Sequence, residues 1–425
     1  MSQTISETIA PAETRSVNMG WIVTFAGTGI NLALGILYTW SVIKGKIPEA
    51  WGWSEAQKSD PYAIACFVFA IAMVVAGRLQ DKLGPRIVAT IGGAAVALGC
   101  IIAGLAGSSY AGFVVGFGVL TGAGIGFGYA SATPPAVKWF PPAKTGLIAG
   151  LVVAGFGLAS VYISPLATWL LNTYGVSNTM IIFGAAFLVV VCGLAQLLKN
   201  PPAGYKPQAP ASAAKAAALK PAIGDKTWRD MLASPNFWVL WLMFFFGSAV
   251  GLTVIGSAQG IAKQSLGDAA FWAVAVLAVG NAGGRIAAGV VSDRIGRQWT
   301  MFLSYVVQCV MVMIPFFFAE SVVALLFAVL MIGACYGANL SLFPSATKDY
   351  FGLKNFGLNY GVMFSAWGVA GLTLPRVDGM IKDAVFAATG AKPMYAETTM
   401  YITISLMVVA AVLTFVSRAI VSKSK

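Results

Sequence analysis

Arg285 is the one basic residue that lies deep inside a long apolar stretch of the sequence. None of the fifteen acidic residues lies near the middle of such a stretch, so no carboxylate of the chain is at hand to pair with it there. Asn281 precedes Arg285 by one helical turn, which puts both side chains on one helix face. A guanidinium holds a carboxylate by two parallel hydrogen bonds, and a neighbouring amide can donate a third. The pair therefore predicts a site for a small organic anion.

The other reactive residue types give no sign of catalysis. The chain has no His, which excludes mechanisms that need an imidazole base, ligand or proton relay. Its five cysteines lie singly in apolar runs without a CxxC pair, which is typical of packing residues. We expect no metal site and no cofactor, and nothing in the sequence predicts an enzyme.

The composition indicates that this arginine belongs to a chain surrounded by lipid. The 425 residues are 58% hydrophobic and 10% charged, with a mean hydropathy of +0.80, so the solvent of this chain must be lipid. Its first 18 residues are polar and do not resemble a cleavable signal peptide. Twelve apolar segments are long enough to cross a bilayer as helices, at about 20–43, 56–79, 87–107, 110–134, 146–170, 179–198, 237–260, 271–292, 301–319, 322–346, 359–379 and 398–418.

One long polar stretch divides these spans into two sets of six. It is rich in Ala, Pro and Lys and is typical of a flexible linker. We therefore expect an all-α membrane protein of two six-helix bundles, at residues 1–200 and 235–425, joined by a linker at residues 201–234.

The basic residues predict the orientation of the chain in the membrane. With the termini, the linker and the even-to-odd connections on one side, that side holds 19 of the 27 Lys and Arg residues, and the opposite side holds 7. By the positive-inside rule both termini are expected in the cytoplasm. The net charge of +12 then follows from topology, and nucleic-acid binding is not expected.

Two segments of the sequence repeat each other, Gly77-Arg-Leu-Gln-Asp81-Lys-Leu-Gly84-Pro-Arg86 and Gly289-Val-Val-Ser-Asp293-Arg-Ile-Gly296-Arg297. Their first glycines are 212 residues apart, and each segment follows the second span of its half. A repeated set of six spans is the architecture of a secondary transporter with a site at the midplane. The chain resembles the major facilitator superfamily, for which this loop motif is specific.

The resemblance implies a mechanical role for these loops. In the superfamily the motif carboxylate is anchored by basic neighbours and by the N-terminus of a helix in the other half. Carried over, Asp81 with Arg86, and Asp293 with Arg297, would latch the cytoplasmic side shut without binding substrate. The alternative is that these residues only fix the geometry of the loop.

Further short motifs resemble the monocarboxylate transporters and their bacterial relatives, the oxalate:formate antiporters. They occur in order at the predicted spans and are Gly20-Trp21, Tyr38-Thr-Trp40, Lys138-Trp-Phe140 before Gly146-Leu-Ile-Ala-Gly150, Ser234-Pro-Asn-Phe-Trp-Val-Leu-Trp241 and Asn359-Tyr-Gly361.

The sequence departs from these two families at three positions where the families carry charged residues. Monocarboxylate transporters typically carry an Asp where Asn281 stands, and that Asp is tied to proton coupling. They also carry a Lys where Val42 stands, and oxalate antiporters carry a Lys that aligns with Trp367. Arg285 is then the only internal cation, and one cation matches one carboxylate, because a dianion would leave a second charge unpaired.

The depth of Arg285 supports this interpretation. It lies eight residues before Asp293, hence about 12 Å from the cytoplasmic end of its helix and close to the midplane. A cation at that depth costs at least about 3 kcal/mol and must face a cavity or a partner. The alternative is an Arg that donates to backbone carbonyls and has a structural role.

Aromatic residues on helices that line superfamily cavities are expected to complete the pocket, namely Tyr129, Tyr336, Tyr38, Phe364 and Trp367, although each of them could instead be a packing residue.

The function that these observations predict is transport of a short monocarboxylate of the lactate or pyruvate type. A co-transported proton would make the cycle electroneutral, and Asp60, Asp378 or the substrate carboxyl could carry it. The alternative is a carboxylate-for-carboxylate antiporter of the oxalate:formate type. We expect a monomer surrounded by lipid in a bacterial inner membrane, with protons and the anion as its partners.

Overall fold

A computed structural model describes residues 12–141, 145–202, 204–205, 225–318, 320–352, 355–391, 393 and 395–423, without the side chains of residues 12–18, Asp81, residues 145–146 and Lys423. Every regular element in this part of the chain is a helix. Residues 203 and 206–224 of the expected linker lie outside the described residues, so the linker boundaries stay a prediction.

The helices and their bounds are α1 (Ala12–Leu34), η1 (Gly35–Thr39), α2 (Trp40–Lys44), η2 (Glu49–Trp51), α3 (Glu55–Leu83), α4 (Pro85–Ala106), α5 (Tyr110–Phe113), η3 (Val114–Thr121), α6 (Gly122–Lys138), α7 (Thr145–Ala195), α9 (Trp228–Leu232), α10 (Pro235–Leu266), η5 (Gly267–Ala270), α11 (Phe271–Ile295), α12 (Arg297–Met311), α13 (Ile314–Phe317), α14 (Val322–Phe351), α15 (Phe356–Thr389) and α16 (Glu397–Lys423).

The described helices accommodate the twelve expected spans. Nine stretches are long and apolar enough to cross a membrane, and two of these, Leu147–Ala195 and Pro235–Ile295, each contain two expected spans. Inside α7 the chain reverses at Gly175, whose φ of 73° is a conformation that residues with a Cβ rarely adopt. The expected span at 359–379 corresponds to α15, which continues to Thr389.

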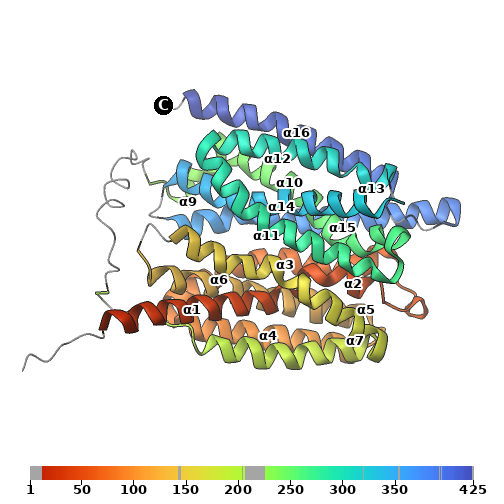
Figure 1. The fold of residues 1–425 in the computed structure, drawn as a ribbon, viewed down its shortest axis with the longest axis horizontal. Coiled ribbons are helices and arrows are strands. Elements are labelled where there is room, and N and C mark those ends of the chain that lie inside the picture. Colours follow the sequence, from red (N-terminus) through yellow and green to blue (C-terminus); the bar gives the residue numbers. More distant parts are fainter. Residues whose placement is uncertain are drawn as a thin grey trace, which may run out of the picture.

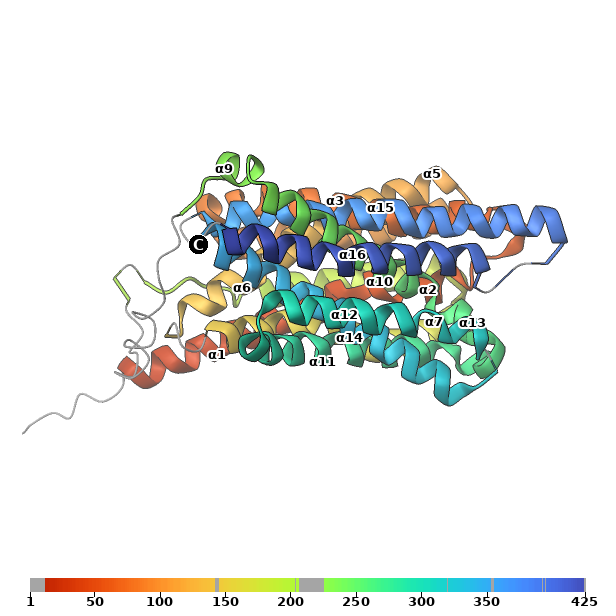
Figure 2. The ribbon, with the colours of Figure 1, turned by 90° about the horizontal axis from the view of Figure 1, so that it is seen from above.

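The helices run along the long axis of the molecule (Figures 1 and 2) and form two halves that lie side by side in Figure 1. The N half comprises α1 to α7, and the C half comprises α10 to α16. The described beginning of α1 and the end of α16 lie at the same end of the bundle (Figure 1). We call this end the linker side and the opposite end the far side.

A glycine seam joins α11 to α14 within the C half, made by Gly280 and Gly284 of α11 and by Gly333 and Gly337 of α14. A Cβ added at any of the four would lie 2.0–2.2 Å from a backbone carbonyl oxygen of the other helix. The two backbones are therefore in direct contact, as small residues allow between helices in a membrane. Because Arg285 follows Gly284, the seam fixes the position from which its side chain extends.

The first span is interrupted at mid-length by the 3-10 turn η1, which follows α1 and precedes α2. A Cβ at Gly35 would lie 2.2 Å from the Ala159 Cβ, so this turn packs directly on α7. The turn carries Tyr38, whose side chain is buried. The interruption therefore presents Tyr38 to the space between the halves.

Polar contacts between the halves hold the far side together. Arg376 of α15 forms an ion pair with Asp60 of α3, with Nη1 and Oδ1 3.3 Å apart. The two carboxylate oxygens of Asp383 accept hydrogen bonds from the backbone N–H groups of Glu55 and Ala56, at 2.7 and 2.9 Å. These are donors that the first turn of α3 leaves free, and a helix N-terminus attracts a carboxylate. Asp383 thus caps a helix of the other half.

The contact between α15 and α3 loosens toward the linker side. A Cβ added at Gly379 would lie 2.7 Å from the Ala56 Cα, and one at Gly361 would lie 3.3 Å from a Val74 methyl group. One turn nearer the linker side, a Cβ at Gly357 would meet nothing within 4 Å. Among the described side chains, no ion pair or hydrogen bond joins the two halves at the linker side. In this conformation the far side is the closed one.

Candidate functional site

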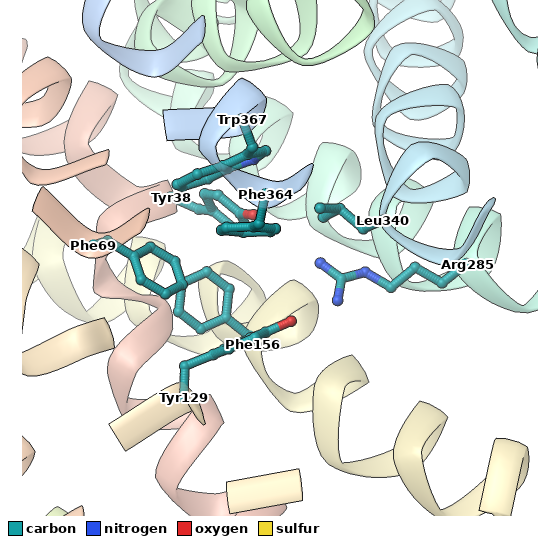
Figure 3. Close-up of a pocket in the computed structure, with 8 residues that line it drawn as sticks. All are labelled: Tyr38, Phe69, Tyr129, Phe156, Arg285, Leu340, Phe364 and Trp367. Atoms are coloured by element: carbon teal, nitrogen blue, oxygen red, sulfur yellow. The ribbon is translucent and has the colours of Figure 1, made fainter. Parts of the chain in front are cut away.

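A small cavity lies between the halves and is lined by four residues from each (Figure 3). Its lining residues are Tyr38, Phe69, Tyr129 and Phe156 from the N half and Arg285, Leu340, Phe364 and Trp367 from the C half. None of these eight carries a negative charge. The enclosed volume is about 10 Å³, room for about one water molecule. A substrate of several carbon atoms therefore requires the rings to move apart.

Arg285 extends from α11 toward the aromatic residues of the N half (Figure 3). Its Nε donates to Asn281 Oδ1 at 3.1 Å, and its Nη1 donates to the Val153 carbonyl oxygen of α7 at 3.2 Å. Arg285 Nη2 and Asn281 Nδ2 are buried and have no hydrogen-bond partner among the described residues. A buried donor without a partner costs about 1–3 kcal/mol. Two such donors, one of them charged, are available to donate to an anionic oxygen.

The aromatic side chains form the wall opposite the guanidinium. Phe364 stacks on Trp367 with ring centroids 5.0 Å apart, and Phe69 meets Trp367 edge-on at 5.1 Å. Tyr129 and Phe156 are in edge contact at 5.3 Å. These separations are those at which aromatic pairs attract. The wall is apolar except for the hydroxyl groups of Tyr38 and Tyr129, which suits a short carbon chain beside a carboxylate.

Tyr336 does not line the cavity but stands behind it. Its hydroxyl accepts a hydrogen bond from Trp367 Nε1 at 2.7 Å and lies 2.7 Å from the Tyr38 hydroxyl. The Tyr336 side chain is fully buried. It therefore connects two cavity residues of different halves, Tyr38 and Trp367.

The structure brings most of the expected pocket together. Arg285, Tyr129, Tyr38, Phe364 and Trp367 line one cavity, and Asn281 contacts Arg285. Sequence reasoning missed Phe69, Phe156 and Leu340. The chain has 26 Phe residues, and no neighbouring motif distinguishes these two from the rest, so the sequence carried no signal for them. The binding role of all these residues stays a prediction.

The expected gating residues lie at the linker side. Asp293 forms an ion pair with Arg297 at 2.9 Å, and Arg297 also pairs with Asp349 at 3.0 Å, so these contacts remain inside the C half. Arg86 is exposed, and the Asp81 side chain lies outside the described residues. The expected latch across the halves is thus absent among the described side chains of this conformation, and its role stays a prediction.

Asp293→Asn is expected to slow turnover and to leave substrate affinity nearly unchanged. In this conformation Asp293 is exposed and its ion pair contributes at most about 1 kcal/mol, so the main effect falls on the state in which the linker side closes. Uptake rates in reconstituted vesicles should show a maximal rate about fivefold lower at a constant KM. Asp268→Asn, an exposed acid on the far side, serves as the control. A raised KM at an unchanged maximal rate would place Asp293 in the binding site instead.

Asp60 and Asp378, the two acids considered as proton carriers, lie at the far side and outside the cavity. Asp60 is paired with Arg376, and Tyr110 donates to it. Asp378 forms an ion pair with Lys382 at 2.7 Å and accepts from Thr399 at 2.8 Å. Both carboxylates are buried among these partners. Neither touches Arg285.

The two helical halves around one cavity agree with what a comparison with protein families finds. The model of the Major Facilitator Superfamily matches residues 19–375 and 245–424, nearly the whole chain. The chain belongs to the major facilitator superfamily. This confirms the fold and the superfamily that the repeated loop motifs indicated, and it makes the protein a multi-pass membrane transporter of this superfamily.

Individual members agree with the narrower resemblance. The uncharacterized MFS-type transporter YhjX of Escherichia coli (strain K12) is 30% identical over 83% of this chain and 86% of its own length. The oxalate:formate antiporter of Oxalobacter formigenes is 30% identical over 80% of this chain and 79% of its own. Monocarboxylate transporter 11 of Mus musculus is 26% identical over 67% of this chain and 62% of its own. The resemblance to both carboxylate families is confirmed.

A solved structure supports the fold. It is that of a bacterial homolog of the human lysosomal transporter Spinster, in an inward-facing and unoccupied conformation. It superposes with a TM-score of 0.69 over 98% of this chain and 99% of the other, at 18% sequence identity. At that identity the likeness concerns the arrangement of the helices alone.

Proposed function

We propose that this superfamily transporter carries a small monocarboxylate of the lactate or pyruvate type across the membrane by alternating access. The observation that carries the proposal is the pair of buried donors without partners, Arg285 Nη2 and Asn281 Nδ2, beside a cavity that both halves line. A carboxylate would accept from both. The oxalate:formate antiporter and the monocarboxylate transporter among the relatives add support, because their names specify carboxylates.

The charge of the cavity supports a substrate with one carboxylate. Arg285 is the only charged residue among the eight that line it. The resemblance through Asn359-Tyr360-Gly361 aligns Trp367 with the Lys that is the second cation of oxalate antiporters. A dianion in this site would keep one carboxylate without a cation, at a cost of several kcal/mol. A monoanion leaves no charge unpaired.

The distribution of basic residues supports a cytoplasmic linker side, by the positive-inside rule. In that orientation the conformation described here is closed toward the outside. The cellular setting that we propose is a bacterial inner membrane, and the functional unit is a monomer, since one chain supplies both halves of the cavity.

Proton symport is the coupling that we propose. An anion moved inward against a membrane potential costs about 2.3 kcal/mol per 100 mV, and a proton that travels with it removes this cost. No acid lines the cavity, so the proton travels on the substrate carboxyl or through the far-side acids Asp60 and Asp378.

The alternative function is a carboxylate exchanger of the oxalate:formate type. It is favoured by the identity of 30% to the Oxalobacter formigenes antiporter and by the absence of the Asp that monocarboxylate transporters carry at position 281. An exchanger moves its substrate only when a second carboxylate leaves the vesicle.

Uptake into reconstituted vesicles tests both functions. Labelled lactate and pyruvate are offered to empty vesicles with an imposed pH gradient, without one, and to vesicles preloaded with unlabelled carboxylate. The proposal expects accumulation that an inward proton gradient increases and that needs no preloading. Uptake that depends on preloading and ignores the gradient would establish the exchanger. Uptake of neither acid under any condition would refute the substrate class.

Replacing Trp367 with Lys is expected to shift the selectivity from monocarboxylates toward dicarboxylates. The substitution adds a second cation to a buried position of the cavity wall, and that cation stays unpaired whenever a monoanion is bound. Competition by oxalate or malonate against labelled lactate should rise relative to the unmodified protein. Unchanged lactate uptake together with no competition by dicarboxylates would mean that position 367 does not contact the substrate.

A further inference from the structure

Three aromatic side chains form a chain of hydrogen bonds that crosses from the C half to the N half. Trp367 of α15 donates from Nε1 to the Tyr336 hydroxyl of α14, and the Tyr336 hydroxyl lies 2.7 Å from the Tyr38 hydroxyl of η1. All three side chains are at most 3% exposed. Tyr336 lies behind the cavity, so no cavity water competes for its hydroxyl group, and the direction of its hydrogen bonds follows from the partners that the structure gives it.

The indole of Trp367 determines the direction of these hydrogen bonds. An indole N–H can only donate, so the Tyr336 oxygen accepts from Trp367. The hydrogen of Tyr336 then has one acceptor among the described residues, the Tyr38 oxygen. If Tyr38 donated instead, the hydrogen of Tyr336 would be left without an acceptor behind the cavity, whereas the hydrogen of Tyr38 can meet a water molecule or a substrate in the cavity, so this arrangement is the costlier one. Tyr336 therefore donates to Tyr38, and the hydrogen of Tyr38 remains for the cavity.

This hydrogen joins two other donors, one on Arg285, which lines the cavity, and one on Asn281, which contacts Arg285. Asn281 uses its Oδ1 to accept from Arg285 Nε, which leaves Asn281 Nδ2 as a donor, and Arg285 Nη2 is a donor by its chemistry. Tyr38 lies across the cavity from Arg285 and on the other half of the molecule. The oriented polar groups at the site therefore all offer hydrogens, and the Tyr38 oxygen already accepts from Tyr336.

We propose that the hydrogen bonds from Trp367 through Tyr336 fix Tyr38 as a donor to the oxygen on C2 of the substrate. The transporter then prefers 2-oxo monocarboxylates to 2-hydroxy monocarboxylates. The inference rests on the proposed function. A 2-oxo oxygen only accepts hydrogen bonds, so it matches Tyr38 while the carboxylate binds Arg285 and Asn281. A 2-hydroxyl group can accept from Tyr38 only while its own hydrogen is left without an acceptor, so it gains little net free energy from this donor.

The hydrogen of a 2-hydroxyl group has few acceptors at this site. Phe69, Phe156 and Phe364 offer none, and Leu340 offers none. The Tyr129 hydroxyl is the remaining polar group of the wall, and a hydroxyl in the same small cavity as the Arg285 guanidinium is most stable with its oxygen turned toward that cation. We expect pyruvate to have a KM about tenfold lower than lactate, the effect of about one unfavourable hydrogen-bond arrangement.

The test is the ratio of the KM values for lactate and pyruvate, measured with purified protein in vesicles, with propionate as a probe that lacks an oxygen on C2. Tyr38→Phe should bring the ratio from about ten to about one by raising the KM for pyruvate, with the KM for propionate unchanged. Tyr336→Phe should lower the ratio about threefold although this residue does not line the cavity, because Tyr38 loses its fixed orientation.

Tyr62→Phe is the matched control. Tyr62 is also a buried tyrosine whose hydroxyl bonds across the halves, to the Leu252 carbonyl oxygen at 3.2 Å, but it does not line the cavity. The Tyr62→Phe variant should leave the ratio of the KM values for lactate and pyruvate unchanged. If the Tyr38 and Tyr336 variants transport propionate normally and keep the preference of the unmodified protein, the inference is wrong and the proposed function stands. If the unmodified protein transports none of the three acids, the proposed function itself fails.

Discussion

Replacing Arg285 with Ala is expected to abolish carboxylate uptake. The guanidinium supplies the only positive charge of the cavity, and its Nη2 is already buried without a partner, so a bound carboxylate gains at least two charge-assisted hydrogen bonds there. Losing two such bonds costs about 3 kcal/mol or more, which is a factor of about 100 or more in kcat/KM. Arg285→Lys keeps the charge but loses the planar pair of donors with which a guanidinium holds a carboxylate. We expect kcat/KM to decrease about 10- to 100-fold.

Uptake of labelled lactate and pyruvate by vesicles of equal protein content measures this effect. Arg294→Ala is the matched control, because Arg294 lies on the same helix, is exposed and faces away from the cavity. It should keep most of the activity. Uptake by the Arg285→Ala protein within a few-fold of the unmodified protein would show that Arg285 does not bind the substrate. The argument for a monocarboxylate would then fail as well.

Asp383→Ala is expected to open the far side. The Asp383 carboxylate caps the first turn of α3 across the interface between the halves, with two hydrogen bonds of 2.7 and 2.9 Å. These bonds exist only while the far side is closed. Their loss destabilises this conformation by about 2 kcal/mol and raises the population with an open far side about 30-fold.

Labelling of a single cysteine detects such a shift. Ser41, which is 3% exposed and lies between Tyr38 and the far-side end of α2, is replaced by Cys in a protein whose five native cysteines are changed to Ala. A membrane-impermeant thiol reagent applied from the far side should react faster in the Asp383→Ala protein. Glu320→Ala, an exposed acid on the same side, should leave the rate unchanged. Equal labelling rates in the Asp383→Ala and unmodified proteins would show that the cap does not control access.

The fold and the centre of the site could be predicted from the sequence for a simple physical reason. Lipid forces each span to be an apolar helix of about 20 residues, so the spans can be recognised one by one. It also makes an unpaired cation conspicuous, which is why Arg285 and its neighbour Asn281 could be identified without a structure. The repeated loop motif then supplied the pairing of the two halves.

The contacts between the halves could not be predicted in the same way. Asp383 and Ala56 are 327 residues apart, and nothing in the local sequence of either indicates that one caps the helix of the other. The hydrogen bond between Tyr38 and Tyr336 spans 298 residues, and its consequence is that Tyr336 supports the cavity wall rather than forming it. Both contacts depend on which face of each helix meets the other half, and an apolar helix in lipid shows little amphipathic pattern to reveal that face.

The glycine seam between α11 and α14 determines what distance measurements on this protein can report. With backbone against backbone at four glycines, sliding these two helices would make them clash, and separating them would lose the packing along the whole seam. Spectroscopic labels at Ile286 of α11 and Phe327 of α14, both lipid-facing and at least 50% exposed, would stay at one separation throughout transport. A pair from Ile286 to Leu158 of α7 spans the interface that must open. The seam thus provides a constant internal standard by which the amplitude of that opening can be calibrated.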